Sequence, residues 1–451
     1  MLPVSSPVPP SDDPASLPVD DHPRVQALRT QPLTIGVVGL GYVGLPLAVT
    51  AAERGHTVVG FDVAEDRVAS LGAGTSHVDD VSDEELAAAL AAGLTVTADE
   101  TALRTADALL LAVPSPLGRN RQPDTSYIEA AAATVSRVAR AGQVVSLEST
   151  TYPGTTEDHL VPAVEAAGLT VDEDVFVAYS PERVDPGNAL GTGAIPKVVG
   201  GVSPVSTAAA VALYERLVDQ VHPVSSARAA ELTKLLENTY RAVNIAMVNE
   251  LAQVAEAFGI DIWEVVDAAA TKPFGFQAFY PGPGVGGHCI PLDPQYLAWR
   301  ARELRVATRF IDLAEDINLH MPDHVVARVA GLLNTRGRAL KGARILGIGL
   351  AYKRNIADDR ESPSVDVLRL LAARGADIHV LDPYVPAERL ARHGFEVVER
   401  AQDAGEVDLA IVLTDHDDLD YAGIAAHAEQ VFDTRGVYRR LGLDVPGVTR
   451  L

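Results

Sequence analysis

One glycine-rich turn between two apolar segments limits the possible folds of this chain more than any other feature. Gly39, Gly41 and Gly44 stand in the pattern Gly-x-Gly-x-x-Gly, after a predicted strand over 34–38 and before a predicted helix over 42–54. In such a turn the first glycine forms the bend, the second lets a pyrophosphate approach the backbone, and the third allows the helix to pack on the strand. The pattern therefore predicts a βαβ unit that binds a dinucleotide.

The last residue of the next predicted strand, over 57–62, indicates which dinucleotide is bound. This residue is Asp62, and a carboxylate at that place bonds to a free ribose 2'-hydroxyl, which favours NAD over NADP. Arg67 argues slightly against this preference, because its guanidinium is able to face a 2'-phosphate. The predicted cofactor contacts of this unit are Gly39, Gly41, Tyr42, Val43, Gly44, Asp62 and Arg67.

Alternating strand and helix patterns predict the rest of the architecture. Apolar runs over 108–113, 144–147 and 175–178 are separated by alanine-rich helical stretches, as in a doubly wound parallel sheet. Long amphipathic helices then dominate 207–328, and a strand–helix–strand pattern returns at 344. We expect the α/β class, with two Rossmann-like doubly wound parallel-sheet domains joined by a helical middle region. The expected segments are a disordered proline-rich leader over 1–31, the NAD-binding domain over 32–206, the helical central domain over 207–329 and the second Rossmann-like domain over 330–451.

Charge and cysteine content exclude several classes of function. The 37 Lys and Arg residues against 61 Asp and Glu residues give a formal net charge of -24, which repels nucleic acid and anionic membranes. Cys289 is the only cysteine, so the chain forms no internal disulfide and no cysteine-rich metal cluster. No apolar run reaches the roughly 20 residues of a membrane helix. We therefore expect a cytoplasmic protein with no nucleic-acid partner, no membrane partner and no bound metal.

Lysine is rare in this chain, and arginine occupies most of the basic positions. The lysines are Lys197, Lys234, Lys272, Lys341 and Lys353. Where arginine has replaced lysine elsewhere, a remaining lysine can mark a place that needs a compact ammonium group instead of a planar guanidinium. Two of the five, Lys234 and Lys353, recur in the motifs described below.

The thiol lies in a segment rich in glycine and proline, over 281–293, where repeated glycines let the backbone approach a ligand. His288 and Asp293 flank Cys289, and a reactive thiolate needs polar neighbours of this kind. Two other interpretations stay open. One is that a lone cysteine is commonly a small buried hydrophobe. The other is that His288, Cys289 and Asp293 bind a metal, although their spacing is not the usual spacing of zinc ligands.

A predicted helix over 229–258 carries a polar stripe on an otherwise apolar surface. Lys234, Asn238 and Arg241 are spaced at i, i+4 and i+7, so they share one helix face, and Asn249 and Glu250 continue the polar positions. A solvated stripe is one explanation. The other is a ligand, because charged side chains on a buried helix need partners.

Taken together, the motifs resemble those of the nucleotide-sugar 6-dehydrogenases, the family of UDP-glucose and UDP-N-acetylhexosamine dehydrogenases. The resemblance spans residues 33–435. Besides the helix around Lys234, it is carried by GLGYVGLPLA at Gly39, VPSP at Val113, ESTTYPGTTE at Glu148, YSPERVDPGN at Tyr179, PGPGVGGHCIPLDP at Pro281 and AYKRNIADDRESPS at Ala351.

The resemblance implies a role for each matched residue. Catalytic roles fall to Cys289 as the nucleophile, to Lys234, Asn238 and Asp293 around the sugar C6, and to Thr150 and Glu182, which would hold a catalytic water. Further NAD contacts would come from Ser115, Thr150 and Arg360. Contacts to the UDP-sugar would come from Glu182, Arg183, Lys234, Asn238, Arg241, Tyr280, Gly286, Lys353 and Arg435. The last two, Lys353 and Arg435, assign UDP-sugar binding to the last domain.

The reaction implied by the resemblance is an NAD-dependent four-electron oxidation of a UDP-sugar at C6 to the uronic acid, through a thiohemiacetal and a thioester. UDP-glucose enzymes typically read GFGGSCFPKD where this chain has Val285, His288, Ile290 and Leu292. Pro186 also replaces their second acidic residue after the Pro-Glu pair. These departures favour a UDP-N-acetylhexosamine, with UDP-N-acetylglucosamine ahead of UDP-N-acetylmannosamine and UDP-glucose.

Two alternatives of other classes remain at this point. One is a two-electron hydroxyacid dehydrogenase, which shares the glycine turn and needs no nucleophilic thiol. The other is a regulator that binds NAD or a nucleotide sugar without catalysis. A second copy of the chain is also an expected partner, because long apolar middle helices are suited to a homodimer or higher homo-oligomer interface.

Overall fold

The structure is a computed structural model that describes residues 19–78, 80–118, 122–184, 192–287 and 289–451. Its contacts divide the chain into two compact units, each described here by itself. The first unit comprises residues 1–115 and 125–232, and the second comprises 116–124 and 233–451. The boundary between Leu232 and Thr233 falls inside one helix.

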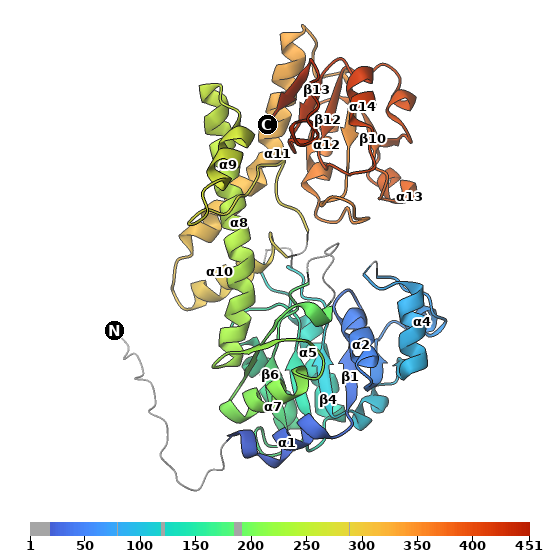
Figure 1. Cartoon of the computed structure of the whole chain (residues 1–451), viewed down its shortest axis with the longest axis vertical. Helices are drawn as coiled ribbons and strands as arrows, with labels where there is room; N and C mark the ends of the chain where they lie inside the picture. Colours follow the sequence, from blue (N-terminus) through green and yellow to red (C-terminus); the bar gives the residue numbers. More distant parts are fainter. Residues whose placement is uncertain (1–18, 79, 119–121, 185–191, 288) are drawn as a thin grey trace. The chain divides into compact units, whose positions relative to one another are not determined.

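The first unit is built on one sheet with the strand order β3-β2-β1-β4-β5-β6-β7-β8. Figure 1 labels β1, β4 and β6 among these strands. Its strands are β1 (Thr34–Val38), β2 (Thr57–Phe61), β3 (Leu94–Thr97), β4 (Ala108–Leu111), β5 (Val144–Leu147), β6 (Phe176–Tyr179), β7 (Lys197–Gly201) and β8 (Val221–Pro223). The ladders from β3 to β6 are parallel, whereas β7 runs antiparallel to β6. This reversal places the first residue of β7 at the sheet edge where β6 ends.

Helices cover both faces of this sheet, as the doubly wound arrangement requires. They are α1 (Pro23–Thr30), α2 (Gly44–Glu53), α3 (Glu65–Gly72), α4 (Asp83–Ala92), α5 (Ser126–Val138), α6 (Val161–Ala166) and α7 (Pro204–Tyr214). Short 3-10 helices are η1 (Val19–Asp21), η2 (Glu100–Thr105) and η4 (Thr192–Ala194), and η3 (Thr156–Leu160) is a π-helical segment. One core contains α1, α2, α4 and α7, and a second core on the opposite face contains α5 and α6.

The predicted disordered leader over 1–31 is wrong for its last part, which is helical from Val19 onwards. Helix α1 begins with a proline in its first turn, and the His22 side chain accepts a hydrogen bond from the Arg24 amide. Val25 and Leu28 are completely buried against the core of the first unit. The prediction failed because two apolar residues on one face are too few for a sequence period, yet enough to anchor a helix by tertiary packing.

The second unit contains another sheet, with the order β11-β10-β9-β12-β13-β14 and all ladders parallel. Its strands are β9 (Arg344–Ile348), β10 (Asp377–Leu381), β11 (Glu396–Val397), β12 (Leu409–Val412), β13 (Val431–Asp433) and β14 (Val448–Arg450). Its helices after the central region are α12 (Pro363–Ala373), α13 (Ala387–Ala391), η5 (Ala401–Ala404), α14 (Tyr421–His427) and α15 (Val437–Arg440). The order is that of a Rossmann fold, and the predicted fold class is confirmed.

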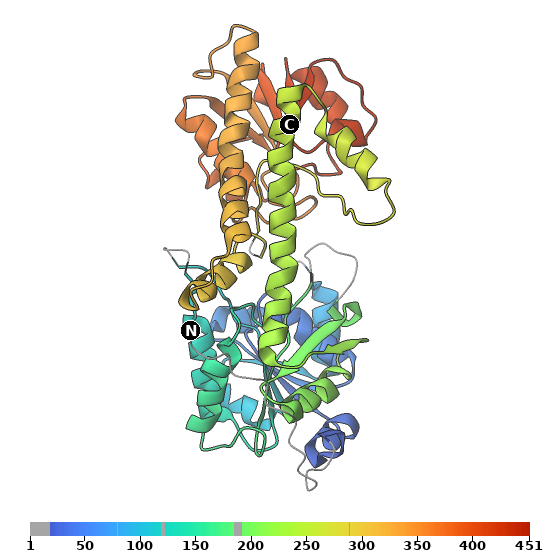
Figure 2. The same ribbon diagram turned by 90° about the vertical axis from the view of Figure 1, so that its left-hand side faces the viewer.

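Four further helices make up the helical middle: α8 (Ala227–Phe258), α9 (Ile262–Ala270), α10 (Asp293–Glu303) and α11 (Arg309–Thr335). Figure 2 shows α8 and α11 running alongside one another. A buried amide pair joins them, because Asn249 donates to Asn318 at 3.0 Å, and Asn318 donates to the Ala242 carbonyl at 3.2 Å. Asn249 also accepts a hydrogen bond from the Gly282 amide. The amide pair therefore holds the start of residues 281–293, the segment that contains Cys289 and is called the cysteine segment below.

The compact units differ from the segments expected from the sequence. Helix α7 crosses the expected boundary at 206, yet all of it belongs to the first unit, in whose core Ala209, Leu213 and Tyr214 are buried. The second half of α11 lies in the same core as the second sheet, through residues such as Met321 and Val325. Both helices therefore cover a sheet. Hydrophobic periodicity alone does not distinguish a helix that covers a sheet from a helix of a separate helical domain.

Among the described residues, no helix combines the length and the hydropathy that crossing a membrane requires.

Candidate active site

The three glycines of the first unit have the geometry that a dinucleotide turn needs. Gly39 has φ +91, and a Cβ there would lie 2.6 Å from the Ala112 carbonyl oxygen. A Cβ on Gly44 would lie 1.8 Å from the Gly39 carbonyl oxygen, so close packing of α2 excludes any side chain. At Gly41 a Cβ would meet no atom within 4 Å, which leaves an open side where a pyrophosphate can approach the backbone. The residues present therefore fit NAD.

Asp62 is buried at the end of β2 and is held by the turn itself. Its Oδ2 accepts from the Leu40 amide at 2.9 Å and from Arg67 Nη1 at 2.8 Å, and its Oδ1 accepts from the Ala64 amide at 3.0 Å. Burial by itself would raise the pKa of Asp62, but the two backbone amides and Arg67 outweigh it, so the pKa lies below its usual value. Arg67 is thus paired with the carboxylate that is predicted to bind the ribose.

Other predicted residues of the first unit follow the carboxyl ends of neighbouring strands. Ser115 follows β4, Thr150 follows β5 and Glu182 follows β6. In the parallel ladder Leu147 pairs with Tyr179, and Thr150 and Glu182 each stand three residues beyond one of these partners. Parallel strands end at a common edge of the sheet, so the fold brings these residues to the edge where Gly39 follows β1.

The Glu182 carboxylate is held on both oxygens. Its Oε1 accepts from the amides of Arg183 at 2.7 Å and Val184 at 2.8 Å, and its Oε2 accepts from Lys197 Nζ at 3.2 Å. The Arg183 side chain donates to the Pro196 carbonyl at 2.7 Å. The sequence indicated Lys197 only as one of five lysines, because its partners Glu148 and Glu182 lie far from it along the chain.

Lys234 and Asn238 on α8 form a buried polar cluster with Asp293, the first residue of α10. The three residues are 7%, 5% and 4% exposed, and Asn238 Nδ2 donates to Asp293 Oδ2. Burial raises the pKa of Asp293 to about 7, although the Lys234 charge and the Asn238 hydrogen bond act in the opposite direction. A carboxyl group that titrates near neutral pH is suited to accepting a proton during catalysis.

Cys289 is exposed and lies in the turn that leads into α10. Its carbonyl accepts from the amides of Leu292 at 3.2 Å and Asp293 at 2.9 Å, so the cysteine is part of the first turn before the helix. The interpretation of this residue as a buried small hydrophobe is therefore wrong. An accessible cysteine at the start of a helix, next to a polar cluster, has the surroundings that a reactive thiol requires.

The cysteine segment packs against the second Rossmann fold through its glycines. A Cβ on Gly282 would lie 2.8 Å from Arg435 Nη1, and a Cβ on Gly287 would lie 2.8 Å from the ring of Tyr352. Arg435 Nε donates to the Leu413 carbonyl at 2.6 Å, which fixes its guanidinium at the end of β12. Arg435, which is predicted to bind the substrate, therefore adjoins the segment that carries Cys289, and Lys353 is the chain neighbour of Tyr352.

Other predicted residues lie outside this buried cluster. Arg241 is exposed on α8, and Arg360 forms a bidentate pair with Asp358 at 2.8 and 2.7 Å. Tyr280 donates to Asp267 at 2.8 Å and stacks on Trp263, with ring centroids 5.3 Å apart.

Two residues considered above, His288 and Pro186, lie outside the described residues. Within the described part of the chain, no group of three or more His, Cys, Asp and Glu side chains is arranged to hold a metal ion.

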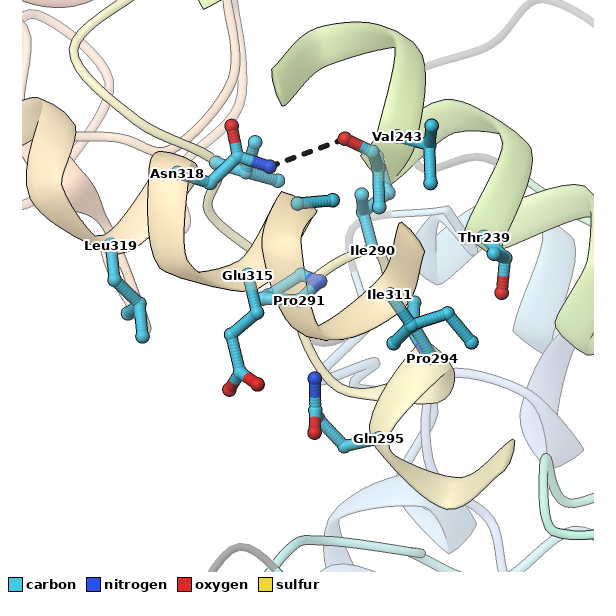
Figure 3. A pocket seen from close by; sticks show the side chains of 13 residues that line it. Thr239, Val243, Ile290, Pro291, Pro294, Gln295, Ile311, Glu315, Asn318 and Leu319 are labelled. Atoms are coloured by element: carbon cyan, nitrogen blue, oxygen red, sulfur yellow. Dashed lines mark hydrogen bonds between the residues drawn. The ribbon is translucent and has the colours of Figure 1, made fainter. Parts of the chain in front are cut away.

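A pocket lies beside the cysteine segment and is lined in part by residues of that segment. It lies between α8, α10 and α11 (Figure 3). Its lining comprises Thr239, Ala242, Val243, Val285, Ile290, Pro291, Pro294, Gln295, Ile311, Ala314, Glu315, Asn318 and Leu319. Val285 and Ile290, which replace residues typical of UDP-glucose enzymes, both line this pocket. The walls of this pocket come from segments that are distant along the chain, so no local sequence pattern predicts it.

The sequence matches the three domains of one family in order. Residues 33–218 match the NAD binding domain of the UDP-glucose/GDP-mannose dehydrogenase family, residues 228–320 match its central domain, and residues 346–440 match its UDP binding domain. These matches confirm the family resemblance that the motifs indicated. They also confirm two predictions, the NAD cofactor and an NAD-dependent dehydrogenase.

Three relatives of the chain cover between 79% and 90% of its length. It is 36% identical over 359 residues to UDP-N-acetyl-D-glucosamine 6-dehydrogenase of Pseudomonas aeruginosa, covering 79% of this chain and 84% of the relative. It is 35% identical over 425 residues to UDP-N-acetyl-D-mannosamine dehydrogenase of Salmonella typhi, covering 90% and 99%. The solved structure of UDP-D-ManNAc dehydrogenase from Pyrococcus horikoshii is similar with a TM-score of 0.80 at 31% identity, covering 90% and 96%. The chain therefore belongs to the UDP-glucose/GDP-mannose dehydrogenase family of NAD-dependent oxidoreductases.

Proposed function

We propose that this protein oxidises the C6 hydroxyl of a UDP-N-acetylhexosamine to the uronic acid in two steps, with UDP-N-acetylglucosamine as the favoured substrate. The observation that carries the proposal is the exposed Cys289 beside the buried Lys234–Asn238–Asp293 cluster, in a segment that also packs on Arg435. The names of the relatives support a UDP-N-acetylhexosamine, because they specify UDP-N-acetyl-D-glucosamine or UDP-N-acetyl-D-mannosamine.

The first oxidation requires a group that accepts the C6 hydroxyl proton. Burial raises the pKa of Asp293 to about 7, so its carboxylate form is accessible near neutral pH to act as this base, either directly or through a water. Lys234 and Asn238 hold the C6 oxygen from the same buried cluster. NAD, when bound at the glycine turn, supplies the hydride acceptor for both oxidations.

The aldehyde produced in the first step is retained by a covalent bond to the protein. The Cys289 sulfur bonds to C6, the carbonyl π electron pair moves to oxygen, and the proton lost from the thiol ends on that oxygen, which gives a thiohemiacetal. The Asn238 amide and the Lys234 ammonium stabilise the developing oxyanion. The second oxidation leaves a thioester on Cys289, which is hydrolysed by a water that Thr150 and Glu182 hold. Binding of the uracil nucleotide falls to the UDP binding domain, with Lys353 and Arg435 as ligands.

The number of NADH molecules formed for each sugar tests this proposal. We expect two NADH for each uronic acid when UDP-N-acetylglucosamine is the substrate, because one alcohol is oxidised by four electrons. NADH is followed by its absorbance, and the acid is quantified by mass spectrometry. A ratio of one would instead support a two-electron dehydrogenase, and no turnover with UDP-N-acetylglucosamine, UDP-N-acetylmannosamine or UDP-glucose would support a regulator that only binds.

An exposed apolar stripe on α8 supports a homodimer. It consists of Leu236, Tyr240, Met247, Leu251, Val254 and Phe258, which are between 45% and 75% exposed. At 3.6 residues per turn these six positions fall within an arc of about 60° on one helix face. So large an apolar face exposed on a helix is suited to covering by another protein surface, and a second copy supplies the same apolar stripe in return.

The Met247→Asp/Leu251→Asp variant is expected to change the molar mass in solution from that of two chains or more to that of one chain. Placing two carboxylates in an apolar interface would desolvate them without partners. Light scattering coupled to size-exclusion chromatography measures the mass. The control is Leu441→Asp, which alters an exposed apolar residue away from the stripe. A single-chain mass for the unaltered protein would contradict the proposed dimer.

A further inference from the structure

A buried ammonium group in the first unit has no role in the reaction described so far. Lys197 is the first residue of β7, and its side chain is 3% exposed. Its Nζ lies 2.6 Å from Glu148 Oε2 and 3.2 Å from Glu182 Oε2. A buried charge is costly unless it is paired, and this lysine is paired with two carboxylates at once.

The two carboxylates stand on segments that follow different strands. Glu148 directly follows β5, and Thr150 stands two residues further along the same segment. Glu182 follows β6, the neighbouring strand. Lys197 is therefore the link between the two segments that carry Thr150 and Glu182, and it occupies this place because β7 runs antiparallel to β6.

The Glu148 end of the link is anchored in the core. Tyr214 on α7 donates its hydroxyl to Glu148 Oε1, and Ser146 is bonded to the same hydroxyl at 2.8 Å. The Lys197 Nζ also lies 5.8 Å from the centroid of the Tyr214 ring. Glu148 is completely buried, so neither it nor Lys197 is available to a substrate. Their contacts hold other groups in place.

The Glu182 end of the link has a defined orientation. Two backbone amides hold its Oε1, and Lys197 holds its Oε2. Burial of Glu182 acts to raise its pKa, but the Lys197 charge and the two amides outweigh this effect and keep the pKa below its usual value. The carboxylate consequently stays ionised at neutral pH, as a hydrogen-bond acceptor for a water must.

We propose that Lys197 is a positioning residue for the last step of the reaction, in which it holds the Glu182 carboxylate and the Thr150 segment in the arrangement that binds the hydrolytic water. This inference rests on the proposed function, because it presumes a thioester on Cys289. In this step the water oxygen bonds to the thioester carbon, and the carbon–sulfur bond breaks with its electron pair on sulfur. One water proton ends on the thiol, the other is released with the carboxylate, and no electron passes to NAD.

The test compares Lys197→Met with the unaltered protein in rapid-quench and steady-state measurements. We expect the variant to form two NADH per active site in an initial burst and then to turn over about 100-fold more slowly, since the loss of a catalytic group's positioning costs about this factor. Intact-protein mass spectrometry is expected to detect the acyl adduct on Cys289, because hydrolysis becomes the slow step. Lys197→Arg, which keeps a cation at this place, is expected to restore part of the rate.

Two further variants separate positioning from folding. Lys341→Met removes an exposed lysine and serves as the matched control, with unchanged burst and turnover expected. If Lys197→Met does not fold, Glu148→Gln/Lys197→Met removes both members of the buried ion pair and still deprives Glu182 of its cation. The double variant is then expected to show the same burst and the same trapped adduct.

Either of two results would overturn the role of Lys197. One is turnover equal to that of the unaltered protein in a folded Lys197→Met or double variant. The other is loss of the burst together with turnover in a folded variant that still binds NAD and UDP-sugar. Failure of the proposed function itself is recognised differently, because the unaltered protein would then form one NADH per sugar and no adduct on Cys289 at any time.

Discussion

Cys289→Ala is expected to lower the rate of uronic acid formation by about 10⁴-fold or more, the loss typical when a nucleophile that forms a covalent intermediate is removed. The exposed thiol is the group proposed to retain the aldehyde, and alanine at this place cannot form a thiohemiacetal or a thioester. Affinity for the UDP-sugar is expected to change little, since Lys353 and Arg435 are on other segments. Acid formation is measured by mass spectrometry, and affinity by calorimetry.

The number of NADH molecules per sugar distinguishes loss of the covalent step from general inactivation. Without Cys289, at most one NADH per sugar is expected, because the second oxidation starts from the thiohemiacetal. Cys289→Ser is the matched control for side-chain size, and it should form acid far more slowly than the unaltered protein. Acid output that stays unchanged in Cys289→Ala would refute the covalent route and would leave a two-electron dehydrogenase as the better explanation.

Lys234→Met is expected to lower kcat/KM by about 10²- to 10⁴-fold and to move its pH dependence to higher pH. The magnitude is that of removing a group that assists proton transfer. The shift in pH follows from Asp293, whose pKa is about 7 because burial raises it while the Lys234 charge partly opposes this effect. Without that charge the pKa of Asp293 rises further, so a higher pH is needed to ionise the base.

The sign of this pH effect is specific to a carboxylate base. In the unaltered protein, kcat/KM is expected to rise tenfold per pH unit below about 7 and to level off above it. In Lys234→Met the same rise should extend above pH 7, whereas Lys341→Met should leave the profile in place. A profile that moves to lower pH in Lys234→Met would contradict the assignment of Asp293 as the base.

Local sequence patterns were sufficient to predict the cofactor turn. Gly39, Gly41, Gly44 and Asp62 lie within one βαβ unit, and short-range backbone geometry decides what each of them can do. The structure places all four as such a unit requires, including the contact that excludes a side chain at Gly44. The helix spacing of Lys234 and Asn238 also predicted correctly that these two side chains share one face.

The same patterns did not predict contacts between distant segments. Arg241 belongs to the same polar stripe as Lys234, but it is exposed while Lys234 is buried, because burial depends on what packs against each turn of α8. The raised pKa of Asp293 requires the enclosure of α10 by other elements. Lys197 gave only a weak signal, as one of five lysines, since its partners Glu148 and Glu182 are 49 and 15 residues away.

What the sequence alone determined is the set of chemical groups: a thiol in a glycine-rich segment, a dinucleotide turn, and two α/β folds that flank helices. These features depend on residue type and short-range spacing, which a linear chain displays directly. Only the tertiary structure decided which of these groups are buried, paired or accessible. Burial and pairing arise when segments far apart in the chain pack together. Desolvation raises the pKa of Asp293, whereas the Lys197 charge and two backbone amides outweigh desolvation and lower the pKa of Glu182.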